Sequence, residues 1–307
     1  MFKLISGFFL GWALGSNDAA NIFGTAVATR TIRFWTAAIL TSIFVIVGAV
    51  LEGSGGMHTL GSLSSQTVNS AFITSLAAAI TVSLMTYLKL PVSTSQAVVG
   101  AIIGSGIVRN TVNFRPLLKI FSAWIFTPIG ALIIAIIFMK IYSKYIENYI
   151  NNIIKLDRIV KIGLVIAGIY GSYALGANNV ANVTGVYVKT GLVSPLQGAL
   201  IGGIAIASGV LTYSRSVMMT VGKKITELSS LNALIAVLAE STTVYIYARI
   251  GIPVSTSQAI VGAVIGIGLI KGINLINKNT LKNILFGWLG TPTIALIISF
   301  IFTKFIN

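Results

Sequence analysis

Two short polar stretches interrupt an otherwise apolar sequence, and they share one pattern. The stretch GSNDAAN at 15–21 recurs as GANNVAN at 176–182. Asn17 and Asn21 are four residues apart, so both amides would lie on one face of a helix, with Asp18 close by. Carboxylate and amide oxygens bind small hard cations, and Gly15 and Gly24 favour a helix break that would free carbonyl groups as further ligands. The predicted cation-binding residues are Asn17, Asp18, Asn21, Asn178, Asn179 and Asn182.

A structural alternative exists for these polar side chains. Asparagine and aspartate within apolar helices can simply hydrogen-bond to neighbouring helices and hold a bundle together. The recurrence of the pattern at 176–182 favours a binding site over this alternative.

A second stretch, PVSTSQA, stands unchanged at 91–97 and at 253–259. Ser93 followed three residues later by Gln96 is the pattern of a capping box at a helix start. The free N–H groups and the positive dipole end of such a start attract anions. A well-capped helix without a ligand is the alternative, but two identical copies favour two helix starts aimed at one anion. The predicted anion-binding residues are Ser93, Thr94, Ser95, Gln96, Ser255, Thr256, Ser257 and Gln258.

The charge balance of such an anion site requires a further component. No lysine or arginine lies within either repeated stretch. Two helix starts supply together about one positive charge. A phosphate ion carries about one to two negative charges, and burying it without compensation is very costly. Cations at the Asn/Asp cluster would close the gap, so anion and cation would bind interdependently, which is the physical basis of symport.

Three further polar residues are candidates for the same site: Thr25, Glu52 and Glu240. Glu52 ends an apolar run. Glu240 lies inside one, where it would either serve a proton or cation or pair with a polar neighbour. The sequence shows no Ser-His-Asp constellation, His/Cys ligand set or ATP-binding loop. We therefore expect no enzyme and no resident cofactor, with a small cation or a proton as co-substrate.

The elements that must position these residues are membrane helices. Hydrophobic residues make up 55% of the 307 residues and charged residues only 9%, whereas soluble proteins have about 25% charged residues. Apolar segments long enough to cross or enter a bilayer lie near 2–28, 34–51, 71–88, 92–108, 116–142, 158–176, 180–213, 231–248, 254–270 and 281–305. The net charge of +15 comes from residues that flank these segments. Such charges orient membrane spans, so we expect no nucleic-acid partner.

The order of the repeated stretches indicates a duplicated chain. We place the repeats at 1–150 and 157–307, joined by a linker at 151–156. Each repeat has about five hydrophobic segments, and an odd number inverts the second copy, as in many secondary transporters. The loop over 53–70 has no lysine or arginine, whereas its counterpart over 214–230 has Arg215, Lys223 and Lys224. This contrast favours opposite sides of the membrane for the two loops.

These observations predict an all-α polytopic membrane protein with two inverted repeats and broken or re-entrant helices. We expect it in the cell membrane with both termini outside, since that arrangement places most of the 21 lysines and arginines inside.

The chain resembles the inorganic phosphate transporter (PiT) family over essentially its whole length. The resemblance rests on both Asn-rich stretches, both PVSTSQ stretches and SRSVMMTVGKKITEL at 214–228. It implies an inverted-repeat fold, a phosphate site where the halves meet, cation coupling and a homodimer. By match, Asp18, Asn21, Asn178 and Asn182 would serve the cations, and the two Ser-Thr-Ser runs would serve phosphate.

The chain departs from the family pattern in two places. Many members have Asp where this chain has Asn179, and the loss of that charge leaves the cation stoichiometry open. Many also have Thr-His where this chain has Ser95-Gln96 and Ser257-Gln258. The missing imidazole favours sodium over protons.

We therefore predict a secondary active transporter that imports inorganic phosphate with sodium. The alternatives are a proton-coupled phosphate permease and a sulfate permease on the same scaffold, since sulfate has the same shape and charge. A passive anion channel, a different class, would need no sodium. A membrane scaffold or receptor is disfavoured by the buried polar repeats. The expected partners are phosphate, sodium, the lipid bilayer and a second copy of the chain.

Overall fold

The computed structural model describes residues 2–88, 92–147, 152–224, 229–272 and 278–306. Within these ranges the chain is helical and forms no strand, apart from one isolated antiparallel bridge between Ser64 and Val112. The first repeat contains α1 (Ile5–Ala28), α2 (Phe34–Glu52), α3 (Ser54–Gly61), α4 (Val68–Tyr87), α5 (Thr94–Val108) and α6 (Phe114–Tyr142). The second contains α7 (Ile153–Lys189), α8 (Pro195–Thr212), α9 (Ser214–Lys224), α10 (Ser230–Ile250), α11 (Thr256–Lys271) and α12 (Lys278–Ile306). Two short helical pieces, Phe2–Leu4 and Ser143–Glu147, adjoin α1 and α6.

Among the described residues, seven helices are long and apolar enough to cross a membrane: α2, α4, α6, α7, α8, α10 and α12. The helices α5 and α11 are apolar but shorter. The predicted boundaries in the second repeat were wrong at one place. The segments near 158–176 and 180–213 divide instead into one long helix, α7, which reaches Lys189, and α8. Moreover, α7 begins at Ile153, inside the stretch predicted as a linker, and residue 151 lies outside the described residues.

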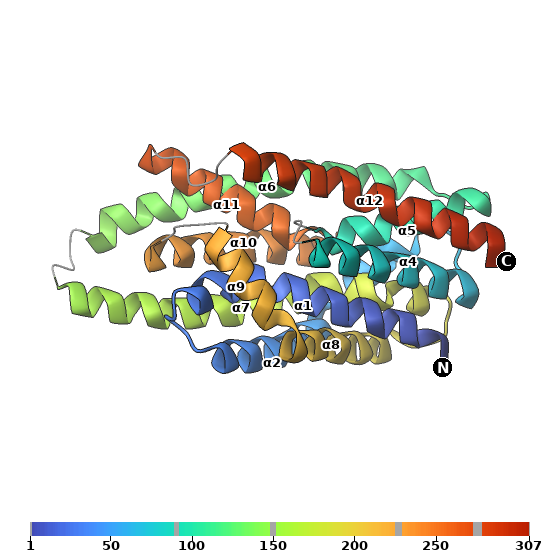
Figure 1. Ribbon diagram of the computed structural model, residues 1–307, viewed down its shortest axis with the longest axis horizontal. Helices are drawn as coiled ribbons and strands as arrows, with labels where there is room; N and C mark the ends of the chain where they lie inside the picture. Colours follow the sequence, from blue (N-terminus) through green and yellow to red (C-terminus); the bar gives the residue numbers. More distant parts are fainter. Residues whose placement is uncertain (1, 89–91, 148–151, 225–228, 273–277, 307) are drawn as a thin grey trace.

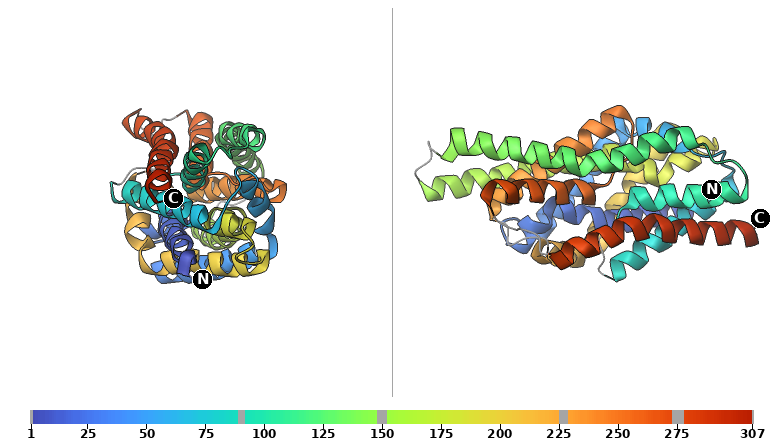
Figure 2. Two further views of the ribbon diagram at one scale, coloured as in Figure 1. Left: turned by 90° about the vertical axis from the view of Figure 1, so that its right-hand side faces the viewer. Right: turned by 90° about the horizontal axis from the view of Figure 1, so that it is seen from above.

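The two repeats run in opposite directions, as predicted. Both chain termini lie at one end of the molecule, on the right in Figure 1 and in the right-hand view of Figure 2. From that end α1 runs away and α7 runs back, and α6 and α12 are opposed in the same way (Figure 1). This end is called the terminal end below, and the other the distal end.

Two re-entrant hairpins bring helix starts into the middle of the bundle. Figure 1 shows α4 entering from the terminal end, stopping near the middle, and α5 returning to the same end. The pair α10–α11 does the same from the distal end. The predicted broken or re-entrant elements are therefore these two hairpins, whose second helices begin within the PVSTSQA stretches.

The hairpins pack reciprocally on the last helix of the other repeat. A methyl group at Gly100 of α5 would clash with the carbonyl oxygen of Pro292 in α12, and one at Gly262 of α11 with that of Pro128 in α6. Small residues allow two backbones to approach this closely. Membrane helices associate through such close packing, because lipid provides no hydrophobic driving force between them. The reciprocal contacts fix both hairpins relative to the opposite repeat.

The predicted helix break around the first polar stretch does not occur, since α1 is continuous from Ile5 to Ala28. Gly15 serves close packing instead, because a side chain there would clash with the backbone of Ile206 in α8. The polar stretch of α7 likewise lies within a continuous helix. The carbonyl groups of these stretches are therefore not released as ligands by a break.

The outer surface suits lipid. Along α6, Ile125, Ile129, Ile133 and Ile137 follow one another at four-residue spacing and are each exposed. This spacing places them in a single apolar stripe on the outside of the helix.

Candidate functional site

The starts of α5 and α11 have the predicted cap, but only half of the predicted capping box. Ser93 Oγ accepts a hydrogen bond from the backbone N–H of Gln96 (3.4 Å), and Ser255 Oγ accepts one from that of Gln258 (3.3 Å). The glutamine side chains do not complete the box, because the Oε1 atoms of both glutamines are buried without a hydrogen-bond partner in the described part of the chain. Both helix starts are therefore capped, and each carries a glutamine oxygen that is free to accept a hydrogen bond.

These two helix starts touch each other. Ser95 Oγ donates to the carbonyl oxygen of Val254 (2.8 Å), and Ser257 Oγ donates to that of Val92 (3.0 Å). The two residues hold equivalent places in the two repeats, so the contact is reciprocal. Because each start belongs to a hairpin that turns in the middle of the bundle (Figure 1), both positive dipole ends meet deep inside the protein.

The polar stretch of α1 meets the start of α11. Asn21 Nδ2 donates to Thr256 Oγ1 (3.1 Å), and the Thr256 hydroxyl in turn hydrogen-bonds the Asp18 carboxylate. Asn17 does not join this group, because its Nδ2 donates to Thr86 Oγ1 on α4 (3.0 Å). The predicted cation ligands of α1 are thus divided, with Asp18 and Asn21 at the helix start and Asn17 away from it.

The polar stretch of α7 meets the start of α5 in the corresponding way. Asn182 Nδ2 donates to Ser95 Oγ (2.9 Å) and to Asn179 Oδ1 (2.8 Å). Asn179 Oδ1 also accepts from Ser95 Oγ (3.3 Å). Each polar stretch therefore contacts the hairpin of the other repeat, and the site is built crosswise.

Asn178, another of the predicted cation ligands, hydrogen-bonds to the turn between α10 and α11. Its Nδ2 donates to the carbonyl oxygen of Ile252 (3.1 Å), and its Oδ1 accepts from the backbone N–H of Val254 (2.9 Å). Both ends of the amide are thus used to hold the turn between α10 and α11. Nothing in the local sequence separates this residue from its neighbour Asn179.

Unused polar atoms gather where these elements meet. Buried polar atoms in proteins are nearly always hydrogen-bonded, so a group of exceptions indicates a missing ligand. Each of the seven residues concerned is at most 3% exposed. The atoms are Asp18 Oδ1, Thr94 Oγ1, Gln96 Oε1, Asn179 Nδ2, Asn182 Oδ1, Glu240 Oε2 and Gln258 Oε1.

The charges of this region are acidic. Asp18 and Glu240 are both buried, and they lie close enough for their charges to interact. No lysine or arginine of the described residues is buried. The positive contributions come from the two helix starts alone, so each carboxylate would need either a proton or a bound cation as its partner.

Two of the additional candidates lie apart from this group. Glu52 forms an ion pair with Arg249 (3.3 Å) and accepts from the Tyr245 hydroxyl (3.2 Å), and it is partly exposed. Thr25 lies one turn beyond Asn21 on α1 and is half-buried. Arg249, the ion-pair partner of Glu52, was not among the residues predicted from the sequence. It lies at the end of α10, just before the turn to α11, and this position could have drawn attention to it.

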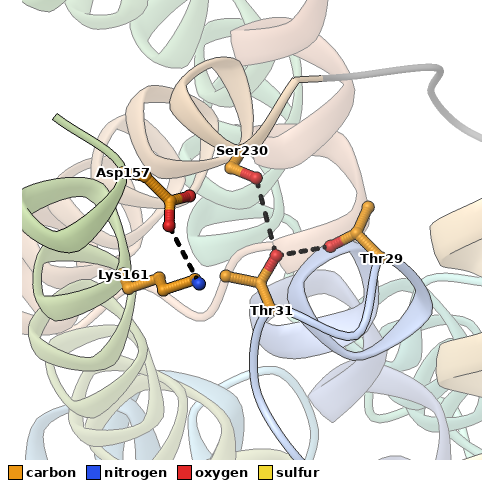
Figure 3. Close-up of polar contacts among 5 residues, drawn as sticks. All are labelled: Thr29, Thr31, Asp157, Lys161 and Ser230. Atoms are coloured by element: carbon orange, nitrogen blue, oxygen red, sulfur yellow. Dashed lines mark hydrogen bonds and ion pairs between the residues drawn. The ribbon is translucent and has the colours of Figure 1, made fainter. Parts of the chain in front are cut away.

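At the distal end, hydroxyl groups join the two repeats. Thr31, after the end of α1, lies 3.5 Å from Ser230 at the start of α10, measured between their Oγ atoms, and Thr29 lies 2.8 Å from Thr31 (Figure 3). Beside them on α7, Lys161 and Asp157 form an exposed ion pair of 2.9 Å (Figure 3). Among the polar contacts between the repeats is therefore this hydroxyl pair of Thr31 and Ser230, beside an exposed ion pair.

Comparison with known proteins agrees with this architecture. The family model described as the phosphate transporter family matches twice, at residues 14–157 and 148–299. A predicted phosphate permease of Methanocaldococcus jannaschii is 36% identical over 304 residues, covering 99% of this chain and 97% of that protein. The sulfate permease CysP of Bacillus subtilis is 31% identical over 304 residues, covering 97% of this chain and 85% of that protein.

A solved structure described as the sodium-dependent phosphate transporter has a TM-score of 0.89, covers 100% of this chain and 99% of its own, and is 24% identical. This likeness establishes the fold. Together with the double match of the family model and the full-length relatives, it identifies the chain as a member of the phosphate transporter family.

Proposed function

We propose that this protein imports inorganic phosphate together with sodium ions. The observation that carries the proposal is the meeting of two capped helix starts beside seven buried polar atoms without partners. Helix starts bind tetrahedral oxyanions through backbone N–H groups, and here Thr94 and the glutamines add side-chain groups. The proposed phosphate ligands remain those of the two PVSTSQA stretches.

The charge balance supports coupling to cations. Two helix starts contribute about one positive charge together, which Asp18 and Glu240 outweigh even before phosphate binds. Oxygen-rich groups flank the phosphate position on both sides: Asp18, Asn21 and Thr256 on one, and Asn179, Asn182 and Ser95 on the other. Such hydroxyl, amide and carboxylate oxygens suit sodium. The structural neighbour described as sodium-dependent supports the same choice.

Protons are the alternative co-substrate. The positions where a proton-carrying imidazole would be expected hold Gln96 and Gln258, which do not titrate, and this favours sodium.

Sulfate is the alternative substrate, since one relative is a sulfate permease. Phosphate near neutral pH carries O–H groups and needs hydrogen-bond acceptors, whereas sulfate carries none. Five of the unused buried atoms are acceptors without a donor: Asp18 Oδ1, Gln96 Oε1, Asn182 Oδ1, Glu240 Oε2 and Gln258 Oε1. A carboxylate oxygen in particular would repel sulfate and accept from phosphate. The site therefore favours phosphate.

The orientation follows from the exposed basic residues at the distal end. The last turns of α6 and the first turns of α7 extend beyond the rest of the bundle there (Figure 1). Their exposed cations are Lys140, Lys144, Lys155, Arg158 and Lys161. By the positive-inside rule we place the distal end in the cytoplasm and both termini outside. We also propose the repeat boundaries given above and a homodimer, which mass spectrometry in detergent would test.

Reconstitution into proteoliposomes tests the function. Uptake of radiolabelled phosphate is measured with the sodium gradient and the pH gradient varied separately, and with excess sulfate as competitor. We expect uptake that requires sodium and resists sulfate. Uptake driven by a pH gradient alone would identify a proton symporter, and inhibition by sulfate would identify a sulfate permease. Ionic currents without a sodium requirement would identify a channel.

A further inference from the structure

An ion pair lies beside the turn of the α10–α11 hairpin. Arg249, near the end of α10, contacts Glu52, the last residue of α2, with 3.3 Å between Nη1 and Oε1. The hydroxyl group of Tyr245, one turn earlier on α10, donates to the same Glu52 oxygen (3.2 Å). The pair therefore joins the hairpin of the second repeat to a helix of the first.

This ion pair lies at the depth of the candidate site. Figure 1 shows α10 ending near the middle of the bundle, and Asn178 in the polar stretch of α7 hydrogen-bonds both Ile252 and Val254 just beyond that end. An unpaired charge at such a depth in a membrane protein is costly, so ionisable side chains there pair with one another. The side chains of Glu52 and Arg249 are 20% and 64% exposed, so the strength of their contact lies between those of a surface pair and a buried pair.

Further contacts hold the turn directly after Arg249. Gly251 has a φ of 75°, a conformation that favours glycine, and a Cβ atom there would lie 3.1 Å from the backbone of Gly55 in α3. Thr59 Oγ1 on the same helix donates to the carbonyl oxygen of Gly251 (2.6 Å). The cap residue of α11, Ser255, follows closely along the chain. A contact that fixes the turn therefore also fixes the start of α11.

The hairpin of the first repeat lacks this ion pair. The counterpart of Arg249 on α4 is Tyr87, and the counterpart of Glu52 at the end of α8 is Tyr213. Both tyrosines are exposed and uncharged. Both repeats have the capped helix start, but only the hairpin that enters from the distal end has a charged contact beside its turn.

We propose that Glu52 and Arg249 are positioning residues, whose ion pair fixes the turn of the α10–α11 hairpin against α2 and so holds the start of α11 in the phosphate site. In the described part of the chain, neither side chain has a polar contact with the PVSTSQA stretches, so both act through the turn and Ser255. The inference rests on the proposed function and adds to it the contact that sets the position of one hairpin.

The effect of the pair depends on its two charges being present together. When one charge is removed, the other is left unpaired at membrane depth, and its side chain turns toward water and displaces the turn. When both charges are removed, no unpaired charge remains, and a neutral pair of similar size can replace the ion pair at little cost. The two single substitutions should therefore be more harmful than the double one.

Phosphate uptake into proteoliposomes tests this expectation. Glu52→Gln and Arg249→Gln should each raise the KM for phosphate about 10-fold, with the maximal rate retained, because a displaced helix start weakens binding without reducing the number of folded transporters. The double variant should have a lower KM than either single variant, whereas two independent residues would multiply their effects to about 100-fold. The matched control is Asp157→Asn, which breaks the exposed ion pair with Lys161 and should keep the wild-type KM.

Thiol labelling follows the turn without any transport. The chain has no natural cysteine, so a cysteine in place of Ile252, which is partly buried in the turn, would be the only reactive thiol. In detergent without phosphate, we expect this cysteine to be labelled faster in both single variants, and at close to the original rate when both charges are removed. Thermal melting of each variant verifies that it is folded.

The two measurements distinguish failure of this inference from failure of the proposed function. An unchanged KM in both single variants would overturn the inference, and so would effects that multiply in the double variant. Unchanged labelling in both single variants would overturn it as well, since the pair would then not hold the turn. A wild type that moves no phosphate contradicts the proposed function instead, while the labelling rates still show whether the pair holds the hairpin.

Discussion

Replacing Asp18 with asparagine should remove most of the sodium dependence of transport. The substitution keeps the shape of the side chain and can preserve the contact with Thr256, while it deletes one full negative charge. A carboxylate about 4 Å from a sodium ion contributes about 4 kcal/mol at an effective dielectric constant of about 20. Since about 1.4 kcal/mol corresponds to a factor of ten, sodium affinity should fall by up to about a thousandfold. Packing should not suffer, because a buried charge without a protein cation does not stabilise the fold.

Phosphate uptake into proteoliposomes over a wide range of sodium concentrations measures this effect. We expect the half-saturating sodium concentration of Asp18→Asn to rise beyond the accessible range, with the melting temperature in detergent equal to or above that of the wild type. Asn17→Ala is the matched control from the same helix, since Asn17 contacts Thr86 and not the helix start. Wild-type sodium dependence in Asp18→Asn would refute the assignment of Asp18 as a cation ligand.

Three further perturbations test other parts of the site. Ser93→Ala and Ser255→Ala each remove a helix cap, which contributes about 1 kcal/mol of stability. Each substitution should raise the KM for phosphate. An unchanged KM in either variant would argue against a site made by both helix starts. Asn178→Ala leaves two backbone groups of the α10–α11 turn without a hydrogen bond, and each such group costs about 1–3 kcal/mol of stability. The melting temperature should therefore fall. An unaltered melting curve would show that the turn is stable without Asn178. Cysteines placed at Thr31 and Ser230 should form a disulfide, since the chain has no natural cysteine that could compete. The disulfide would tie α1 to α10, so uptake should stop until it is reduced. Full uptake with the disulfide formed would show that transport does not require these two helices to separate.

Much of the fold could be predicted because the sequence repeats itself. The identical PVSTSQA stretches favoured two equivalent helix starts, and the charge contrast between the loops at 53–70 and 214–230 favoured opposite orientations. The structure confirms the inverted repeats and shows α5 and α11 beginning within those stretches. Capping patterns are local, so they can be read from a few neighbouring residues.

The partners of the polar residues could not be predicted in the same way. Helical spacing placed Asn17 and Asn21 on one face of α1, but their side chains reach α4 and α11 respectively. Which neighbour a face meets depends on the packing of all the helices. The glycine at position 15 was open to two interpretations for the same reason. A glycine permits either a break or a close approach, and only the position of Ile206 on α8 decides for the second.

The crosswise construction gives sodium release and phosphate release a common cause. The hairpin α10–α11 enters from the distal end (Figure 1), which we place inside the cell, and we infer that it covers the proposed site on that side. Thr256, the first residue of α11, hydrogen-bonds both Asp18 and Asn21 on α1. If this hairpin withdraws to release phosphate inward, Thr256 leaves the sodium site at the same time, and the affinity of that site falls. Conversely, sodium bound between α1 and α11 holds the hairpin closed over the phosphate. A ligand that binds one conformation better shifts the protein toward it by its differential affinity, so under the proposed function sodium and phosphate would each stabilise the state that retains the other.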